Sequence, residues 1–172
     1  MSISKTDLFH GAVLAKLLRE SPTALRLFEH RASERAVYSV DGLPGNQQAF
    51  FFVKSSASPR SSKRNGGCSW SFTFLPEHMK ELRDLRDRGL VQIALVCGSN
   101  ELKGDGPPLE VCLVSMTELE KVVNLRSVSS ESVRVESAQR KKLRLYGGGA
   151  RDPLLIPRKR IDSIAEVFGT GG

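Results

Sequence analysis

Cysteine and histidine are scarce in this chain, and neither is arranged as a metal site or a disulfide framework. The three cysteines, Cys68, Cys97 and Cys112, are an odd number without a Cys-x-x-Cys pair, and the three histidines lie far apart. Zinc sites need several such ligands at short spacing, and secreted disulfide folds carry paired cysteines. We therefore expect neither zinc nor disulfides, and a protein of a reducing compartment, the cytoplasm.

Long apolar runs are also missing. No segment approaches the roughly 18 apolar residues of a membrane helix, and the N-terminus lacks the basic and apolar parts of a secretory signal. Hydrophobic residues make up 40% and charged residues 26% of the chain, a balance that excludes a disordered composition. A length of 172 residues suits one core. We therefore expect a single domain over residues 1–172, with no membrane partner.

Acidic residues are absent from residues 42–76, a stretch that contains four basic ones. A second basic stretch, residues 138–162, holds eight lysines and arginines against two aspartates, so it carries +6 of the net charge of +7. Clustered basic residues on an otherwise balanced domain are typical of a protein that binds a polyanion. Nucleic acid is the partner that we expect. The alternative is a solvated basic face that only aids solubility.

Hydrophobic periodicity predicts the elements of the first hundred residues. Phe9, Val13 and Leu17 recur at helical spacing and predict a first helix. Pro76 opens a second helix, which Gly89 ends. Alternation or continuous apolar character predicts strands at 23–29, 34–41, 49–53 and 90–97. Residues 55–69 show no periodicity and are expected to form a long basic loop, followed by an extended segment at 70–74.

The remaining chain predicts shorter elements and completes the expected fold. Strands are expected at 110–114, 132–136 and 142–146, a short helix at 115–123, and a last amphipathic segment at 158–168. The prediction is a mixed α/β fold, with a central mixed sheet and an α-β-β-β-α-β core over residues 4–98, flanked by helices. A basic C-terminal strand and helix extension covers residues 99–168, and residues 169–172 are expected to be a flexible tail.

Lys54 is the leading functional candidate of the core. It ends an apolar strand, and Asp41 ends the strand that precedes the intervening turn. A lysine at the mouth of a buried strand is costly unless an anion meets it there. Asp41 and Lys54 are therefore the candidate catalytic pair. The alternative is that Asp41 starts an Asp-Gly turn and Lys54 only closes a strand.

With these two residues, the α-β-β-β-α-β order resembles the restriction-endonuclease-like PD-(D/E)XK nuclease fold over roughly residues 4–98. In that family an aspartate, and an acid two positions before a lysine, hold divalent cations, and the lysine orients the attacking water. The resemblance implies that Asp41 takes the aspartate position and Lys54 the lysine position. It also implies Mg²⁺ as the cofactor of an active enzyme.

Phe52 stands two positions before Lys54, where the family has an acid. A phenyl ring cannot bind a cation, and hard cations need several oxygen ligands. The pattern therefore favours a degenerate member that binds without cleaving. An active Mg²⁺-dependent endonuclease would need a relocated carboxylate from Glu20, Glu29 or Glu34. A third possibility is a protein-interaction module whose Ser/Arg-rich loop binds an acidic partner.

The leading hypothesis is a nucleic-acid-binding domain that contacts the phosphate backbone. Trp70, at the end of the expected basic loop, is the one aromatic residue placed to stack on a base. No metal ligands are assigned. The residues expected to contact nucleic acid are Lys54, Arg60, Lys63, Arg64, Trp70, Arg140, Lys141, Lys142, Arg144, Arg158, Lys159 and Arg160.

Overall fold

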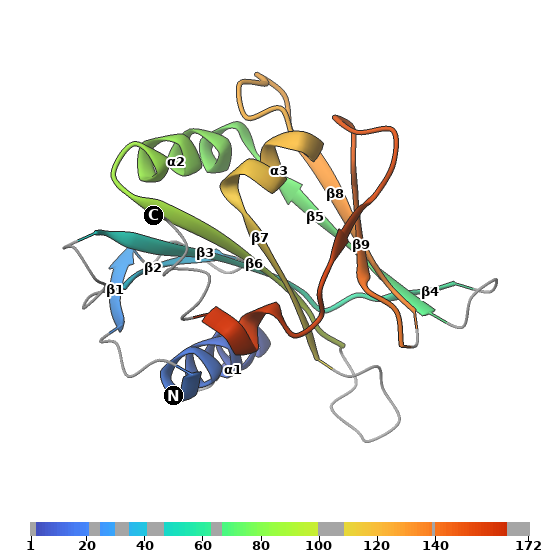
Figure 1. Cartoon of the computed structure of the whole chain (residues 1–172), viewed down its shortest axis with the longest axis horizontal. Helices are drawn as coiled ribbons and strands as arrows, with labels where there is room; N and C mark the ends of the chain where they lie inside the picture. The colour runs from blue at the N-terminus through green and yellow to red at the C-terminus, as the bar shows by residue number, and fades with distance from the viewer. Residues whose placement is uncertain are drawn as a thin grey trace.

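The computed structural model describes residues 3–20, 25–29, 35–40, 47–62, 67–99, 109–138 and 140–164. The helices are α1 (Lys5–Glu20), α2 (Pro76–Arg86), α3 (Met116–Val122) and the 3-10 helix η2 (Arg160–Ser163). The strands are β1 (Leu25–Glu29), β2 (Arg35–Val40), β3 (Ala49–Ser56), β4 (Arg60–Ser62), β5 (Gly67–Phe74), β6 (Leu90–Cys97), β7 (Glu110–Ser115), β8 (Glu131–Ser137), β9 (Leu143–Gly147) and β10 (Leu154–Ile156). The strands form two sheets (Figure 1), which confirms the expected mixed α/β class.

Sheet A has the strand order β1-β2-β3-β6-β7. Strands β1, β2 and β3 form an antiparallel meander, β6 runs parallel to β3, and β7 pairs antiparallel with β6. A parallel neighbour needs a long crossover. Here the chain leaves β3 through β4, β5 and α2 before it returns as β6. The predicted α-β-β-β-α-β order is therefore present, with two strands of the second sheet inserted before α2.

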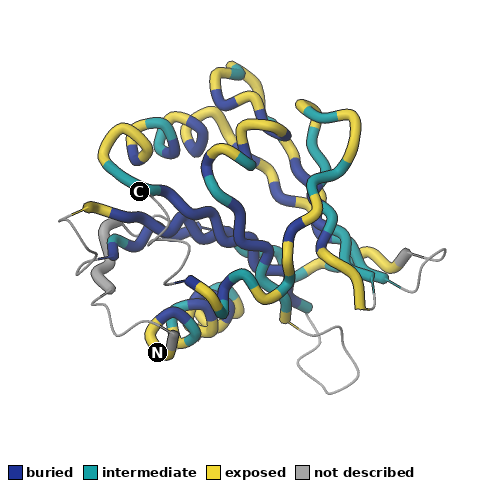
Figure 2. Tube along the Cα trace, in the orientation of Figure 1, coloured by how far each residue is buried: buried dark blue, intermediate teal, exposed yellow. Residues whose placement is uncertain are grey.

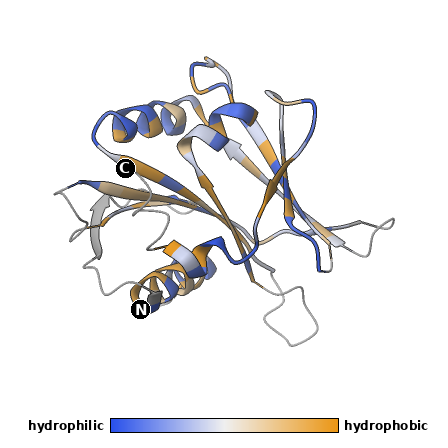
Figure 3. Cartoon of the chain, in the orientation of Figure 1, coloured by the Kyte–Doolittle hydropathy of each residue, from blue (hydrophilic) through white to orange (hydrophobic). Residues whose placement is uncertain are grey.

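Sheet A is covered on both faces, and this explains why β3 and β6 are apolar almost throughout. In β3, Phe51 and Val53 pack toward α1 and η2, whereas Phe50 and Phe52 pack toward α2, α3 and the second sheet. Figure 2 shows these strands as the most continuously buried part of the chain, and Figure 3 shows their hydrophobic character. None of the described helices is long and apolar enough to cross a membrane.

Sheet B is antiparallel and has the strand order β10-β9-β8-β5-β4. Its inner face contributes Trp70, Phe72, Val135 and Leu145 to the same hydrophobic core that lies against sheet A. The basic C-terminal extension is therefore folded onto the rest of the protein through β8, β9 and β10 and does not form a separate arm.

The prediction of one long loop at 55–69 is wrong for the part of this segment that the structure describes. Strand β3 continues to Ser56, β4 occupies Arg60–Ser62, and β5 already begins at Gly67. The sequence of this stretch lacks a hydrophobic period because its residues are mostly small or polar, and of its strands β4 lies at the edge of sheet B. Gly67 lies so close to β8 that a Cβ at this position would be 2.1 Å from the Ser137 carbonyl oxygen. Only glycine fits there.

Candidate nucleic-acid interface

The outer face of sheet B carries a row of polar side chains that crosses four strands. Trp70 is buried, so its neighbour Ser69 points to the opposite, outer face. The register places Arg60 of β4 opposite Ser69, Ser69 opposite Glu136 of β8, and Glu136 opposite Arg144 of β9. With strands about 4.8 Å apart, the Cα atoms of Arg60 and Arg144 are roughly 14 Å apart on one face.

The next positions along these strands contain an arginine whose guanidinium lies over a tyrosine ring. Arg134 of β8 lies opposite Tyr146 of β9 and Ser71 of β5. The Arg134 guanidinium carbon is 4.7 Å from the centre of the Tyr146 ring, a cation–π contact, and its Nη2 is 3.2 Å from Glu136 Oε1.

We call this surface the sheet B face. It is defined by Arg60, Ser69, Ser71, Thr73, Ser132, Arg134, Glu136, Arg144, Tyr146 and Leu155. Most of these side chains are exposed, and none of the described helices packs over them (Figure 2). The sheet B face contains three arginines and one glutamate, so its net charge is +2.

The turn between β8 and β9 extends this positive charge. Arg140, Lys141 and Lys142 are all exposed, and we call them the basic turn. Arg140 has a φ of 57°, a left-handed conformation that lets the chain reverse direction, and the Lys141 amide donates to the Ala138 carbonyl at 3.2 Å. The basic turn adjoins Arg144, so the sheet B face and the basic turn form one cationic surface.

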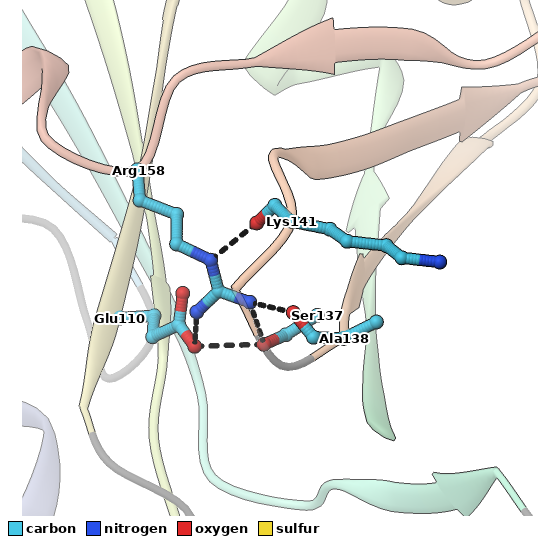
Figure 4. A network of polar contacts seen from close by, with 5 residues as sticks. All are labelled: Glu110, Ser137, Ala138, Lys141 and Arg158. Atoms are coloured by element: carbon cyan, nitrogen blue, oxygen red, sulfur yellow. Dashed lines mark hydrogen bonds and ion pairs between the residues drawn. The ribbon is translucent and has the colours of Figure 1, made fainter. Parts of the chain in front are cut away.

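Arg158 was expected to contact phosphate, but it is part of an internal network (Figure 4). Its guanidinium forms an ion pair with Glu110 at the start of β7 and donates to the Ala138 and Lys141 carbonyls. It also donates to Ser137 Oγ at 2.9 Å, and that hydroxyl donates to Glu110 Oε1 at 2.7 Å. Arg158 therefore joins β7 to the β8–β9 turn, and its guanidinium is engaged within the protein, so phosphate contact by Arg158 stays a prediction.

Arg160 is also paired inside the protein. It forms an ion pair with Glu118 of α3 and donates to the Leu113 carbonyl at 3.2 Å. Glu118 and Ser115 form the capping box of α3. Burial alone would raise the pKa of Glu118, but hydrogen bonds from Arg160 and Ser115 lower it below its usual value. Arg160 is thus a structural residue, whereas the neighbouring Lys159 is exposed.

Lys54 lies in a buried polar cluster and not at the surface. It is 3% exposed, and the register places it opposite Arg35, on the face of sheet A that packs against α2. Arg35 Nε is 3.4 Å from Glu81 Oε2, and His78 is also buried. Burial, followed by the charges of Lys54 and Arg35, lowers the pKa of His78 to about 4. The expectation that Lys54 meets a phosphate is therefore wrong for the folded chain.

The described part of the β2–β3 hairpin does not supply a carboxylate for the candidate metal site. Strands β2 and β3 contain no acidic residue, and Phe52 is 0% exposed within the core. Val40, the residue before Asp41 in the sequence, lies opposite Ala49. The Val40–Ala49 pair is five residues along the strands from the Arg35–Lys54 pair, so the two pairs are about 17 Å apart. Asp41 lies outside the described residues. Among the residues that are described, no group of three or more His, Cys, Asp or Glu side chains could hold a metal ion.

Trp70 is a core residue. It is 1% exposed, and its indole Nε1 donates to the Gly98 carbonyl at 2.6 Å. The expectation that Trp70 stacks on a base is therefore wrong. Lys63 and Arg64, the other expected contacts of this segment, lie outside the described residues.

Arg134 and Tyr146 were not among the candidates from the sequence. The alternating polar and apolar pattern of residues 131–137 and 143–147 marks them as outward-facing positions. That signal identifies a polar face, but it does not pair these two side chains, because the pairing depends on the register of β8 with β9.

Two hollows lie elsewhere on the protein. One, of about 420 Å³, lies between α1, β7 and η2, where Lys16 Nζ is 2.9 Å from Asp162 Oδ1. The other, of about 710 Å³, lies between α2 and residues 126–128. There Lys80 pairs with Asp84 at 2.7 Å, and Arg83 donates to the Leu125 carbonyl. The exposed Arg126 also lines this second hollow, whereas the basic turn brings three exposed cations together in consecutive positions.

Comparison with protein families, with curated proteins and with solved structures finds no match to this chain.

The low pKa of His78 predicts that the protein loses stability in mild acid. An unfolded histidine has a pKa of about 6.5, whereas the folded value is about 4. Between these values the unfolded chain binds a proton that the folded chain does not, so stability falls as the pH decreases. We expect His78 to contribute a loss of about 3 kcal/mol between pH 7 and pH 4. Urea unfolding over this pH range measures it.

The matched variant is His78→Asn, because an asparagine oxygen can replace Nδ1 as the acceptor of the Leu75 amide, a bond of 3.2 Å. The difference in stability between the wild type and this variant should change with pH. Parallel pH profiles would contradict the explanation. In NMR titrations, Lys54→Met should raise the pKa of His78, because it removes one of the charges that lower it.

Proposed function

We propose that this protein is a nucleic-acid-binding domain that contacts the phosphate backbone through the sheet B face and the basic turn. The observation that carries the proposal is the convergence of Arg60, Arg144 and the basic turn on one exposed surface, although they are about 80 residues apart in the sequence. Lysine and arginine at such a surface neutralise phosphates and release counterions.

We further propose that the core is nuclease-like but does not cleave. The α-β-β-β-α-β order supports a nuclease-like arrangement. The buried Phe52 and the absence of carboxylates in the described parts of β2 and β3 argue against a metal-dependent reaction at Lys54. Incubation of plasmid DNA and of RNA with Mg²⁺ should leave both intact. Cleavage that requires Mg²⁺ and is lost in Lys54→Ala would support the active-enzyme alternative instead.

Salt dependence of binding tests the proposed function. We expect the affinity for a labelled oligonucleotide, measured by fluorescence anisotropy, to fall steeply as salt rises. A protein that neutralises about five phosphates should give a slope of roughly −4 in a plot of log K against log salt. A flat response, or no binding at about 50 mM salt, would contradict phosphate binding and would favour the reading in which this surface binds an acidic protein.

A further inference from the structure

We propose that the sheet B face binds single-stranded nucleic acid, with a base stacked on the paired side chains of Arg134 and Tyr146. This inference rests on the proposed function, because it specifies which form of nucleic acid the same surface binds. It also assigns a stacking site to Arg134, which lies outside the two basic stretches of the sequence, and to Tyr146.

The Arg134–Tyr146 pair is accessible to solvent. The Arg134 side chain is 51% exposed, while its guanidinium lies over the Tyr146 ring and is restrained by Glu136. A guanidinium held in this way has lost rotational freedom before a ligand arrives. Unpaired bases stack on arginine planes and on aromatic rings, and a second flat group behind the first strengthens such a platform.

The surroundings of this pair suit bases that lie flat. The neighbouring outward-facing side chains are short hydroxyls, and the hydroxyls of Thr73 and Ser132 are 3.4 Å apart. Ser71 lies opposite Arg134 on the same face. Short side chains leave space over the sheet, and hydroxyls can donate to or accept from base edges.

A duplex would not use this surface in the same way. Sequence in a duplex is read by an element that enters a groove, such as a helix or a two-stranded ribbon. The sheet B face is formed by the strands of one sheet, and the described helices do not contribute to it. In a duplex the bases are stacked on one another, so Arg134 and Tyr146 could not contact their planes. A single strand can place its bases on the sheet and its phosphates near Arg144 and the basic turn.

The test compares Arg134→Lys with Arg19→Lys. The first change keeps the charge of the sheet B face but removes the planar group, and the second makes the same change on the exposed surface of α1. Affinities for a labelled single strand of about 16 nucleotides, and for the duplex of the same length, are measured by anisotropy at about 50 mM salt. Thermal unfolding confirms that both variants are folded.

We expect the wild type to bind the single strand more tightly than the duplex. Arg134→Lys should weaken single-strand binding about tenfold, the loss of one stacked base, with duplex binding and the salt slope unchanged. Tyr146→Leu should weaken single-strand binding in the same way, and Tyr146→Phe should restore it. Arg19→Lys should have no effect.

Two other outcomes overturn the inference, and they can be distinguished. If the duplex binds as tightly as the single strand, and Arg134→Lys behaves like Arg19→Lys, there is no stacking site, but phosphate binding stands. If neither form binds at low salt, the proposed function fails together with the inference.

Discussion

Replacing Arg158 by methionine is expected to lower the free energy of unfolding by about 3 kcal/mol. The side chain of its partner Glu110 is only 11% exposed, so the substitution leaves a nearly buried carboxylate with Ser137 as its remaining hydrogen-bond partner. It also removes the donor to the Ala138 and Lys141 carbonyls. Breaking a buried ion pair from one side typically costs 3–5 kcal/mol, and the partial exposure of Arg158 places the estimate at the lower end. Urea unfolding at neutral pH measures the loss.

Lys159→Met is the matched control for this prediction. Lys159 is the next residue and is exposed, so its replacement should change stability by less than about 0.5 kcal/mol. Equal stability of Arg158→Met and the wild type would contradict the role of the network. If Arg158→Met is folded but binds the oligonucleotide far more weakly than Lys159→Met does, Arg158 contacts phosphate in addition to its role in the network.

Neutralising the basic turn is expected to produce the largest loss of binding. In the triple variant Arg140→Gln, Lys141→Gln and Lys142→Gln, three exposed cations disappear. If each contacts one phosphate, the slope of log K against log salt should become less steep by about 2 for a single strand. The affinity at low salt should fall more than tenfold. The fold should persist, because Lys141 takes part in the Arg158 network only through its backbone carbonyl.

The control for the triple variant removes the same amount of charge elsewhere. Arg19, Lys80 and Lys121 are exposed on α1, α2 and α3, and their replacement by glutamine lowers the net charge equally. This protein should keep the wild-type salt slope. If both triple variants lose affinity to the same extent, binding follows the net charge of the protein, and the assignment to the basic turn is wrong.

The sequence was sufficient to predict the elements whose pattern is local. The apolar runs that became β3 and β6, Pro76 at the start of α2, and Ser115 at the start of α3 each lie where they were expected. The edge strand β4 was missed, because the side chains of Arg60–Ser62 are polar and their pairing with β5 is visible only in the sheet.

The candidate site could be predicted only in part, because side-chain partners come from distant segments. Arg158 and Arg160 count as free positive charges in the sequence, but their carboxylates lie 48 and 42 residues away. Lys54 ends a strand in a way that suggests a surface position, yet α2 covers it in the folded chain. Conversely, the sequence does not identify Arg134 as a candidate, because its contact with Tyr146 depends on the pairing of β8 with β9.

The most direct test of the central claim is to locate the binding surface by NMR. Backbone amide shifts of the labelled protein are followed while a short single-stranded oligonucleotide is added. The account predicts that the largest changes occur on the sheet B face and in the basic turn, at Ser71, Arg134, Arg144, Tyr146 and residues 140–142. Changes confined to α1, or to the hollow between α2 and residues 126–128, would contradict it.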